Sequence, residues 1–132
     1  MLVNIDVPDR AAAEAFYVDA FGLIPARRFG GGAVELLGWE APVYLLEKPA
    51  GSIGAADEPR RYERHWSPVH LDVVVEEIEP ALARAWAAGA TAETAIRTEA
   101  WGRIVGLADT FGHGICLIQF TRRGYDEIAS PA

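Results

Sequence analysis

The stretch Pro68-Val69-His70-Leu71-Asp72-Val73-Val74-Val75 indicates how the whole chain is built. Successive side chains of a strand alternate between its two faces, so one face of this stretch is wholly apolar, formed by Val69, Leu71, Val73 and Val75. The opposite face carries His70, Asp72 and Val74. The alternation therefore predicts a strand over residues 68–75 that rests on a core and presents a histidine and an aspartate on its other side.

The composition is that of one globular domain. The chain has 132 residues, of which 51% are hydrophobic and 23% are charged, so it can bury a core. Its formal net charge of -7 disfavours nucleic acid or an anionic membrane as partner, because both are bound through clustered Lys and Arg. The single cysteine, Cys116, excludes an intrachain disulfide. We see no signal peptide and no apolar run of about 20 residues, so we predict a soluble, cytoplasmic protein.

The first part of the chain predicts a strand, a helix and three further strands. Residues 2–7 alternate, and Asp9 suits the N-cap of a helix over residues 11–21. The helix has Ala12, Phe16 and Ala20 at helical spacing, and Gly22 marks its end. Short strands are predicted over residues 23–29, 33–37 and 43–47, with turns at residues 30–32 and 38–42 between them.

The same order then recurs. The strand over residues 68–75 is followed by a helix that starts at Glu79-Pro80, has Trp86 at core spacing and is stopped by Gly89. Three more strands are predicted over residues 91–96, 102–108 and 114–120, with a turn at residues 109–113. The residues between the two copies, 49–67, are predicted to be an irregular loop, of the kind that runs over a surface or covers a cleft.

A pattern written twice predicts an internal duplication. In each half the helix would cover the apolar face of the first strand, so the opposite faces of the two half-sheets can line a shared concavity. We divide the single domain, residues 1–132, into module one (1–48), the loop (49–67), module two (68–120) and a tail (121–132).

Several motifs resemble the vicinal oxygen chelate superfamily of glyoxalases, bleomycin-resistance proteins and extradiol dioxygenases. In module one these are Val3-Asn4-Ile5-Asp6-Val7-Pro8-Asp9, Ala15-Phe16-Tyr17 and Phe21-Gly22-Leu23. In module two they are His70-Leu71-Asp72-Val73-Val74-Val75, Ala87-Ala88-Gly89-Ala90, Trp101-Gly102-Arg103 and Ala108-Asp109-Thr110-Phe111-Gly112-His113-Gly114. The resemblance extends nearly to Phe120. It implies an α+β fold in which two βαβββ modules form a cupped mixed sheet with the helices outside, in a homodimer.

Metal enzymes that this chain resembles take their ligands from the first and last strands of each module. Carried over, these positions fall on Leu2, near Leu45, and on His70 and Cys116. Leucine has no lone pair to donate, so we predict that the usual divalent metal is not bound. An alternative is a rearranged divalent metal site around His70 that includes Glu47, two residues beyond Leu45, and also Asp6 or His113.

His70 is our candidate catalytic residue, because its imidazole titrates near neutral pH when unperturbed. Asp72 lies two residues away on the same face, a spacing that is poor for orienting His70. Cys116 lies in an apolar strand, where a buried and inert thiol is expected. His113 should point opposite to Cys116 unless the turn twists it, and His65 should lie at the surface. The candidate substrate-binding residues are Trp39, Trp66 and Trp101 near loops, Tyr44, Arg103, His113 and Cys116.

We therefore expect a glyoxalase- or bleomycin-resistance-like homodimer that binds a small, partly apolar molecule in the cupped cleft. It would do so without the usual metal, either as a binding protein or as a catalyst that relies on His70. One alternative is a metal-dependent lyase, isomerase or dioxygenase. Another is a structural interaction module that has no pocket.

Overall fold

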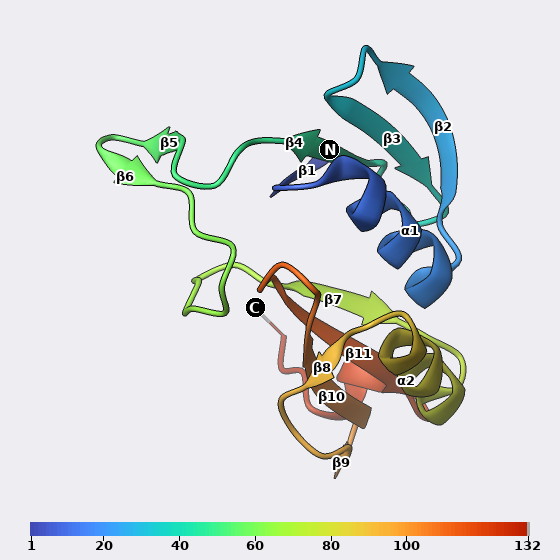
Figure 1. Cartoon of the computed structure of the whole chain (residues 1–132). Helices are drawn as coiled ribbons and strands as arrows, with labels where there is room; N and C mark the ends of the chain where they lie inside the picture. Colours follow the sequence, from blue (N-terminus) through green and yellow to red (C-terminus); the bar gives the residue numbers. More distant parts are fainter. Residues whose placement is uncertain (132) are drawn as a thin grey trace.

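The structure, a computed structural model that describes residues 1–131, has two sheets with the same strand order. Sheet one has the order β1 (Val3–Val7), β4 (Val43–Glu47), β3 (Ala33–Leu37) and β2 (Ile24–Phe29). Sheet two has the order β7 (Leu71–Val74), β11 (Gly114–Phe120), β10 (Gly102–Ala108) and β8 (Thr91–Ala92). In sheet one β1 pairs in parallel with β4, and in sheet two β7 pairs in parallel with β11; the other pairs are antiparallel. The predicted α+β fold of two βαβββ modules is confirmed (Figure 1).

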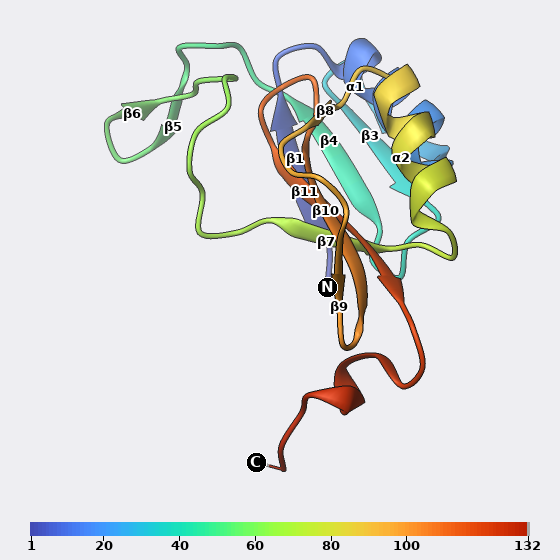
Figure 2. The ribbon, with the colours of Figure 1, turned by 90° about the horizontal axis from the view of Figure 1, so that it is seen from below.

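The two helices, α1 (Arg10–Phe21) and α2 (Ile78–Ala87), pack against each other and lie side by side in Figure 2. Asp9 caps α1 by accepting a hydrogen bond from the Ala12 amide at 2.9 Å, and Gly22 ends it with a left-handed φ of 69°. The buried face of α1 differs from the predicted one, because Ala12 is exposed. The residues that it buries are Ala13, Phe16, Tyr17 and Ala20.

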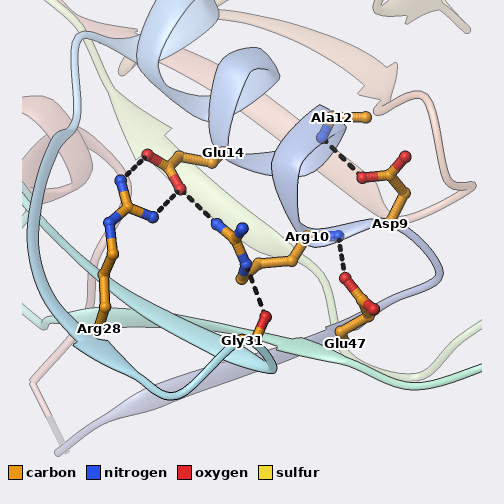
Figure 3. Close-up of polar contacts among 7 residues, drawn as sticks. All are labelled: Asp9, Arg10, Ala12, Glu14, Arg28, Gly31 and Glu47. Atoms are coloured by element: carbon orange, nitrogen blue, oxygen red, sulfur yellow. Dashed lines mark hydrogen bonds and ion pairs between the residues drawn. The ribbon is translucent and has the colours of Figure 1, made fainter.

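Ion pairs fasten the start of α1 to sheet one (Figure 3). The Glu14 carboxylate accepts hydrogen bonds from Arg10 at 2.7 Å and from both terminal nitrogens of Arg28 on β2, at 2.6 and 2.7 Å. Glu47, at the end of β4, accepts a hydrogen bond from the backbone amide of Arg10 at 3.0 Å. Because negative charge is stabilising at a helix N-terminus, Glu47 supports the helix.

Trp86 was predicted to lie in the core, and this prediction is wrong. Its side chain is 55% exposed, because the buried stripe of α2 consists of Ile78, Ala81, Leu82 and Ala85. Trp86 follows the last of these by one residue, which is about 100° further around a helix.

The strand predicted over residues 91–96 is shortened to β8 (Thr91–Ala92), and a second short strand, β9 (Arg97–Glu99), follows beyond the predicted range. β8 pairs with one end of β10, and β9 pairs with the other end. Between β8 and β9 the Thr94 hydroxyl accepts a hydrogen bond from the Gly106 amide at 2.9 Å. A side chain therefore replaces part of the strand pairing, as such hydroxyls can.

The central loop is less irregular than predicted, because it contains a hairpin of β5 (Ile53–Ala55) and β6 (Glu58–Pro59). Figures 1 and 2 show this hairpin extending away from both sheets. After the hairpin, Arg60 donates to the Asp6 carboxylate of β1 at 2.6 Å, and Arg64 pairs with Glu93 of module two. The loop is thus held by both modules. No helix within residues 1–131 is long and apolar enough to cross a membrane.

A three-residue polar cluster occupies the inner face of sheet one, which is the face away from α1. The carboxylate of Glu35 on β3 accepts two hydrogen bonds from Arg27, at 2.5 and 2.7 Å, and one from the Tyr44 hydroxyl at 2.6 Å. The hydrogen bonds from Arg27 and then Tyr44 lower the pKa of Glu35 to about 2. These contacts make Tyr44 part of the framework of the sheet.

Replacing Gly112 by alanine should destabilise the fold. Gly112 has a φ of +89°, and an added Cβ would lie 2.6 Å from the carbonyl carbon of Glu63 in the loop. The strain and the clash should lower the free energy of unfolding by about 1–3 kcal/mol. The matched control is Gly31→Ala, since a Cβ there has open space and the φ is not positive. Urea unfolding of both variants measures the difference, and equal stabilities would contradict the contact between the loop and Gly112.

Glu35 should make stability depend on pH in the acid range. Its folded-state pKa of about 2 lies below the ordinary value of 4.5, so its contribution is fully present above about pH 4.5. The contribution is lost as the pH falls toward 2, where the folded protein also takes up the proton. Glu35→Gln should therefore flatten the pH dependence of the free energy of unfolding in this window. Tyr44→Phe should give an intermediate profile, and an unchanged profile in both variants would refute the cluster.

Candidate functional site

His70, Asp72 and Cys116 form a cluster on sheet two. β7 and β11 run in parallel with Asp72 opposite Cys116, and one ligand atom from each of the three residues lies within 4.8 Å of the other two. His70 Nε2 is 3.2 Å from Asp72 Oδ1, so the expected poor orientation of this pair is wrong. β7 begins at Leu71, three residues later than the predicted strand over residues 68–75, so His70 lies outside the regular strand.

The Cys116 side chain is half-buried. Burial, followed by the negative charge of Asp72, raises the pKa of the Cys116 thiol. The thiol therefore keeps its proton at neutral pH and is a poor nucleophile, as expected for a structural cysteine. It can become a metal ligand only by losing that proton.

Two adjoining cavities meet at His70. The seam cavity, of about 300 Å³, lies between β1 and β7, and its lining includes Asn4, Asp6, His65, His70 and His113. The sheet cavity, of about 270 Å³, lies on the inner face of sheet two, and its lining includes Arg64, Trp66, His70, Glu93 and Cys116. Ser67, Val69, His70 and Gly114 line both. His70 thus stands at the junction of the two spaces, with residues of both modules around it.

His113 lies in the seam cavity and is held from behind by a buried aspartate. Its Nδ1 is 2.7 Å from Asp109 Oδ2, and the same oxygen accepts a hydrogen bond from the Tyr17 hydroxyl of α1 at 3.0 Å. We did not identify Asp109 or Tyr17 as site residues from the sequence. The Asp-x-x-Gly-His turn was visible there, but the burial of Asp109 against another module's helix was not.

The predicted tryptophans are distributed over three different places. Trp66 lines the sheet cavity and is 82% exposed. Trp39 packs on Tyr17 and Phe21 of α1 and lines a separate hollow of about 400 Å³ beside Val3 and residues 71–74. Trp101 packs on Phe120 and on Tyr125 of the tail, with a ring distance of 5.0 Å to Tyr125. The structure therefore places only Trp66 beside His70.

Arg103 and Tyr44 are engaged in other contacts. Arg103 pairs with Glu79 at the start of α2, and Tyr44 is bonded to Glu35 and Arg27. Neither residue lines the seam or sheet cavity. His65, expected at the surface, is exposed but also lines the seam cavity, and its Nδ1 is 2.8 Å from the Glu63 carbonyl oxygen.

The positions in module one do not supply metal ligands to this cluster. Leu45 is fully buried and pairs with the buried Ile5, so it faces the core rather than the cleft. Glu47 lies on the same side as Leu45 and serves the start of α1 through the Arg10 amide. The structure therefore does not bring Glu47 to His70, and Asp6 is paired with Arg60.

Comparison with known proteins adds the family and the fold. The sequence of residues 2–118 matches the family model of the glyoxalase-like domain. No curated protein matches the chain in sequence.

Solved structures share the fold at low sequence identity. The fosfomycin resistance protein FosX from Listeria monocytogenes is 16% identical, with a TM-score of 0.73, and the match covers 98% of this chain and 96% of FosX. A glyoxalase/bleomycin resistance protein/dioxygenase family enzyme from Burkholderia phytofirmans is 19% identical, with a TM-score of 0.72, covering 91% and 97%. Lactoylglutathione lyase from Agrobacterium tumefaciens is 22% identical, with a TM-score of 0.61, covering 90% and 91%. Because the family model matches residues 2–118, the chain belongs to the glyoxalase-like domain family, and it shares the fold of these solved structures.

Proposed function

We propose that this protein binds a small, partly apolar molecule in the cleft formed by the seam and sheet cavities, with His70 as the central contact. The observation that carries the proposal is the position of His70 at the junction of the two cavities. Its side chain is 56% exposed, so its imidazole is accessible to a ligand. The two spaces, of about 300 and 270 Å³, suit a small molecule rather than a polymer.

The lining indicates the chemistry of the ligand. The seam cavity has apolar walls from Val3, Ile5, Val69 and Leu71, with imidazoles and one carboxylate between them. Such a lining favours a molecule with an apolar body and a few hydrogen-bonding groups. A structural neighbour, a mutant of FosX from Listeria monocytogenes, was solved with Mn(II) and a dihydroxypropylphosphonic acid. That neighbour supports small-molecule binding as a use of this fold.

The leading form of the proposal is a cleft that works without the usual divalent metal. In module one Leu2 is exposed but has no lone pair to donate, and Leu45 faces the core, so neither of the positions carried over from the superfamily's metal enzymes supplies a ligand to the cleft. His70, whose Nε2 lies 3.2 Å from Asp72 Oδ1, then contacts the ligand directly and acts as its hydrogen-bond partner or proton acceptor.

We also propose a homodimer. Several large apolar side chains of sheet one and its ends are exposed in the single chain, and burying them against a second copy would be favourable. They are Leu2, Ile24, Phe29 and Leu37.

A test of the ligand site compares His70→Ala with a surface control. In a saturation-transfer NMR screen of small aromatic and aliphatic acids and alcohols, we expect hits that compete for one site. His70→Ala should weaken them about tenfold, which corresponds to the loss of one hydrogen bond of about 1.4 kcal/mol. Trp86→Ala changes an exposed side chain of α2 outside the two cavities and should leave the affinities unchanged. Hits that bind equally well to His70→Ala would contradict the proposed site.

The second candidate is a metal-dependent lyase, isomerase or dioxygenase, and the His70–Asp72–Cys116 cluster favours it. A nitrogen, a carboxylate oxygen and a sulfur donor within 4.8 Å of one another match the three protein ligands that catalytic zinc sites keep. These residues fit a divalent ion, which would supply Lewis-acid activation of a ligand oxygen. Because the pKa of Cys116 is raised, metal affinity should increase with pH.

Metal analysis separates the two candidates. We expect protein purified without chelators to lack stoichiometric divalent metal by plasma mass spectrometry. Added Co²⁺ should give only a weak thiolate-to-cobalt absorption band, and Cys116→Ser should abolish it. Glu47→Gln should keep the band, because Glu47 lies at the start of α1. Stoichiometric metal that is lost in His70→Ala would overturn the metal-free form and establish the second candidate.

A further inference from the structure

The carboxylate of Asp109 has four hydrogen-bond donors around it. Oδ1 accepts from the backbone amides of Phe111 at 2.8 Å and His113 at 2.9 Å. Oδ2 accepts from the Tyr17 hydroxyl at 3.0 Å and meets His113 Nδ1 at 2.7 Å. The side chain of Asp109 is completely buried. Four donors with no second acceptor beside them are the surroundings of an ionised carboxylate.

The pKa directions agree with this geometry. Burial alone would raise the pKa of Asp109, but the hydrogen bond and the charge of His113, with the amides of His113 and Phe111, outweigh it and lower the pKa. Burial and the Asp109 charge raise the pKa of Tyr17 well above its ordinary value, so its hydroxyl keeps the hydrogen that it donates. Asp109 therefore acts only as an acceptor.

An acceptor beside His113 Nδ1 fixes where the ring carries its hydrogen. Nδ1 must be the protonated nitrogen, which leaves Nε2 as the acceptor of the neutral imidazole. Nε2 is on the other side of the ring from Asp109, and the His113 side chain, one-third exposed, lines the seam cavity. The ring is thus anchored at Nδ1, and its partly exposed side chain lines the seam cavity.

All three histidines of the chain line the seam cavity, but they are held differently. The ring of His65 contacts the backbone oxygen of Glu63, and the ring of His70 contacts the exposed carboxylate of Asp72. His113 alone of the three has a buried carboxylate behind it. The other charged group of this lining, Asp6, is paired with Arg60.

We propose that His113 is a second proton-transfer residue of the cleft, and that Asp109 and Tyr17 are its positioning residues. The ligand would be a molecule with an acidic O–H group. Its O–H bond breaks, the proton moves to His113 Nε2, and the electron pair stays on the ligand oxygen; the proton returns when the ligand leaves. The imidazolium that forms faces the Asp109 carboxylate, which stabilises it. This inference rests on the proposed binding function of the same cleft.

A purely structural role would need only the contact between His113 Nδ1 and Asp109, which holds the turn over residues 109–113 together. The variant His113→Asn separates the two roles, because the amide nitrogen of asparagine can take the place of Nδ1 while nothing replaces Nε2. We expect its melting temperature to remain close to that of the wild type. Its spectrum also assigns the His113 resonances by their disappearance.

The experiment is long-range nitrogen–proton NMR of protein labelled with ¹⁵N-histidine. We expect wild-type His113, when neutral, to carry its hydrogen on Nδ1 and to show Nε2 as the unprotonated nitrogen. In Asp109→Asn the amide group should donate to Nδ1 instead, so the hydrogen should move to Nε2. Peptide mass spectrometry after diethyl pyrocarbonate treatment should find His113 modified in the folded wild type, because Nε2 is accessible.

Two results would overturn the proposal. One is a wild-type His113 that carries its hydrogen on Nε2, and the other is a His113 that reacts only after unfolding. If Asp109→Asn does not fold, the tautomer of His113 in the wild type and its modification by diethyl pyrocarbonate still test the proposal. Because these measurements need no ligand, a failed ligand screen with the expected tautomer would count against the binding function and not against the geometry of His113.

Discussion

The hydrogen bond between Tyr17 and Asp109 joins the two modules through their common core. Its partners are 92 residues apart, and both side chains are buried. A buried carboxylate is stable only when its oxygens are paired, so Asp109 requires α1 of module one to stay in place. The turn over residues 109–113 is folded around the same carboxylate. The position of α1, the shape of this turn and the His113 wall of the seam cavity therefore depend on one interaction.

The two modules share a strand order but use their inner faces differently. The inner-face charges of module one are held in ion pairs, with Glu35 bound to Arg27 and Tyr44 within the module, and Asp6 bound to Arg60 of the loop. In module two His70 and Cys116 line the sheet cavity, and Asp72 lies close to both. The two copies of the duplicated fold thus differ, since the charges of module one are paired while His70 and Cys116 of module two line a cavity.

The central loop gives the cleft its third side. Its ion pairs reach Asp6 on β1 and Glu93 of module two, and its residues His65, Trp66 and Ser67 line the cavities at His70. Close contact with the turn of module two requires a residue without a side chain at Gly112. The loop over residues 49–67, which was predicted to be irregular, therefore contributes side chains to the lining of both cavities.

The sequence by itself determined the repeated strand–helix–three-strand order, the cap at Asp9 and the glycine that ends α1, because alternation and capping are local properties. It also singled out His70 from the polar face of one strand. The break between β8 and β9, the hairpin in the loop and the exposure of Trp86 depended on neighbours that local spacing does not describe. The same is true of the site partners. Asp72 lies beside His70, which precedes β7, and Glu47 bonds to the start of α1. Asp109 meets Tyr17 only when the turn of module two lies against α1. Those contacts join residues that are distant in the chain or outside regular alternation, so the tertiary structure alone decided them.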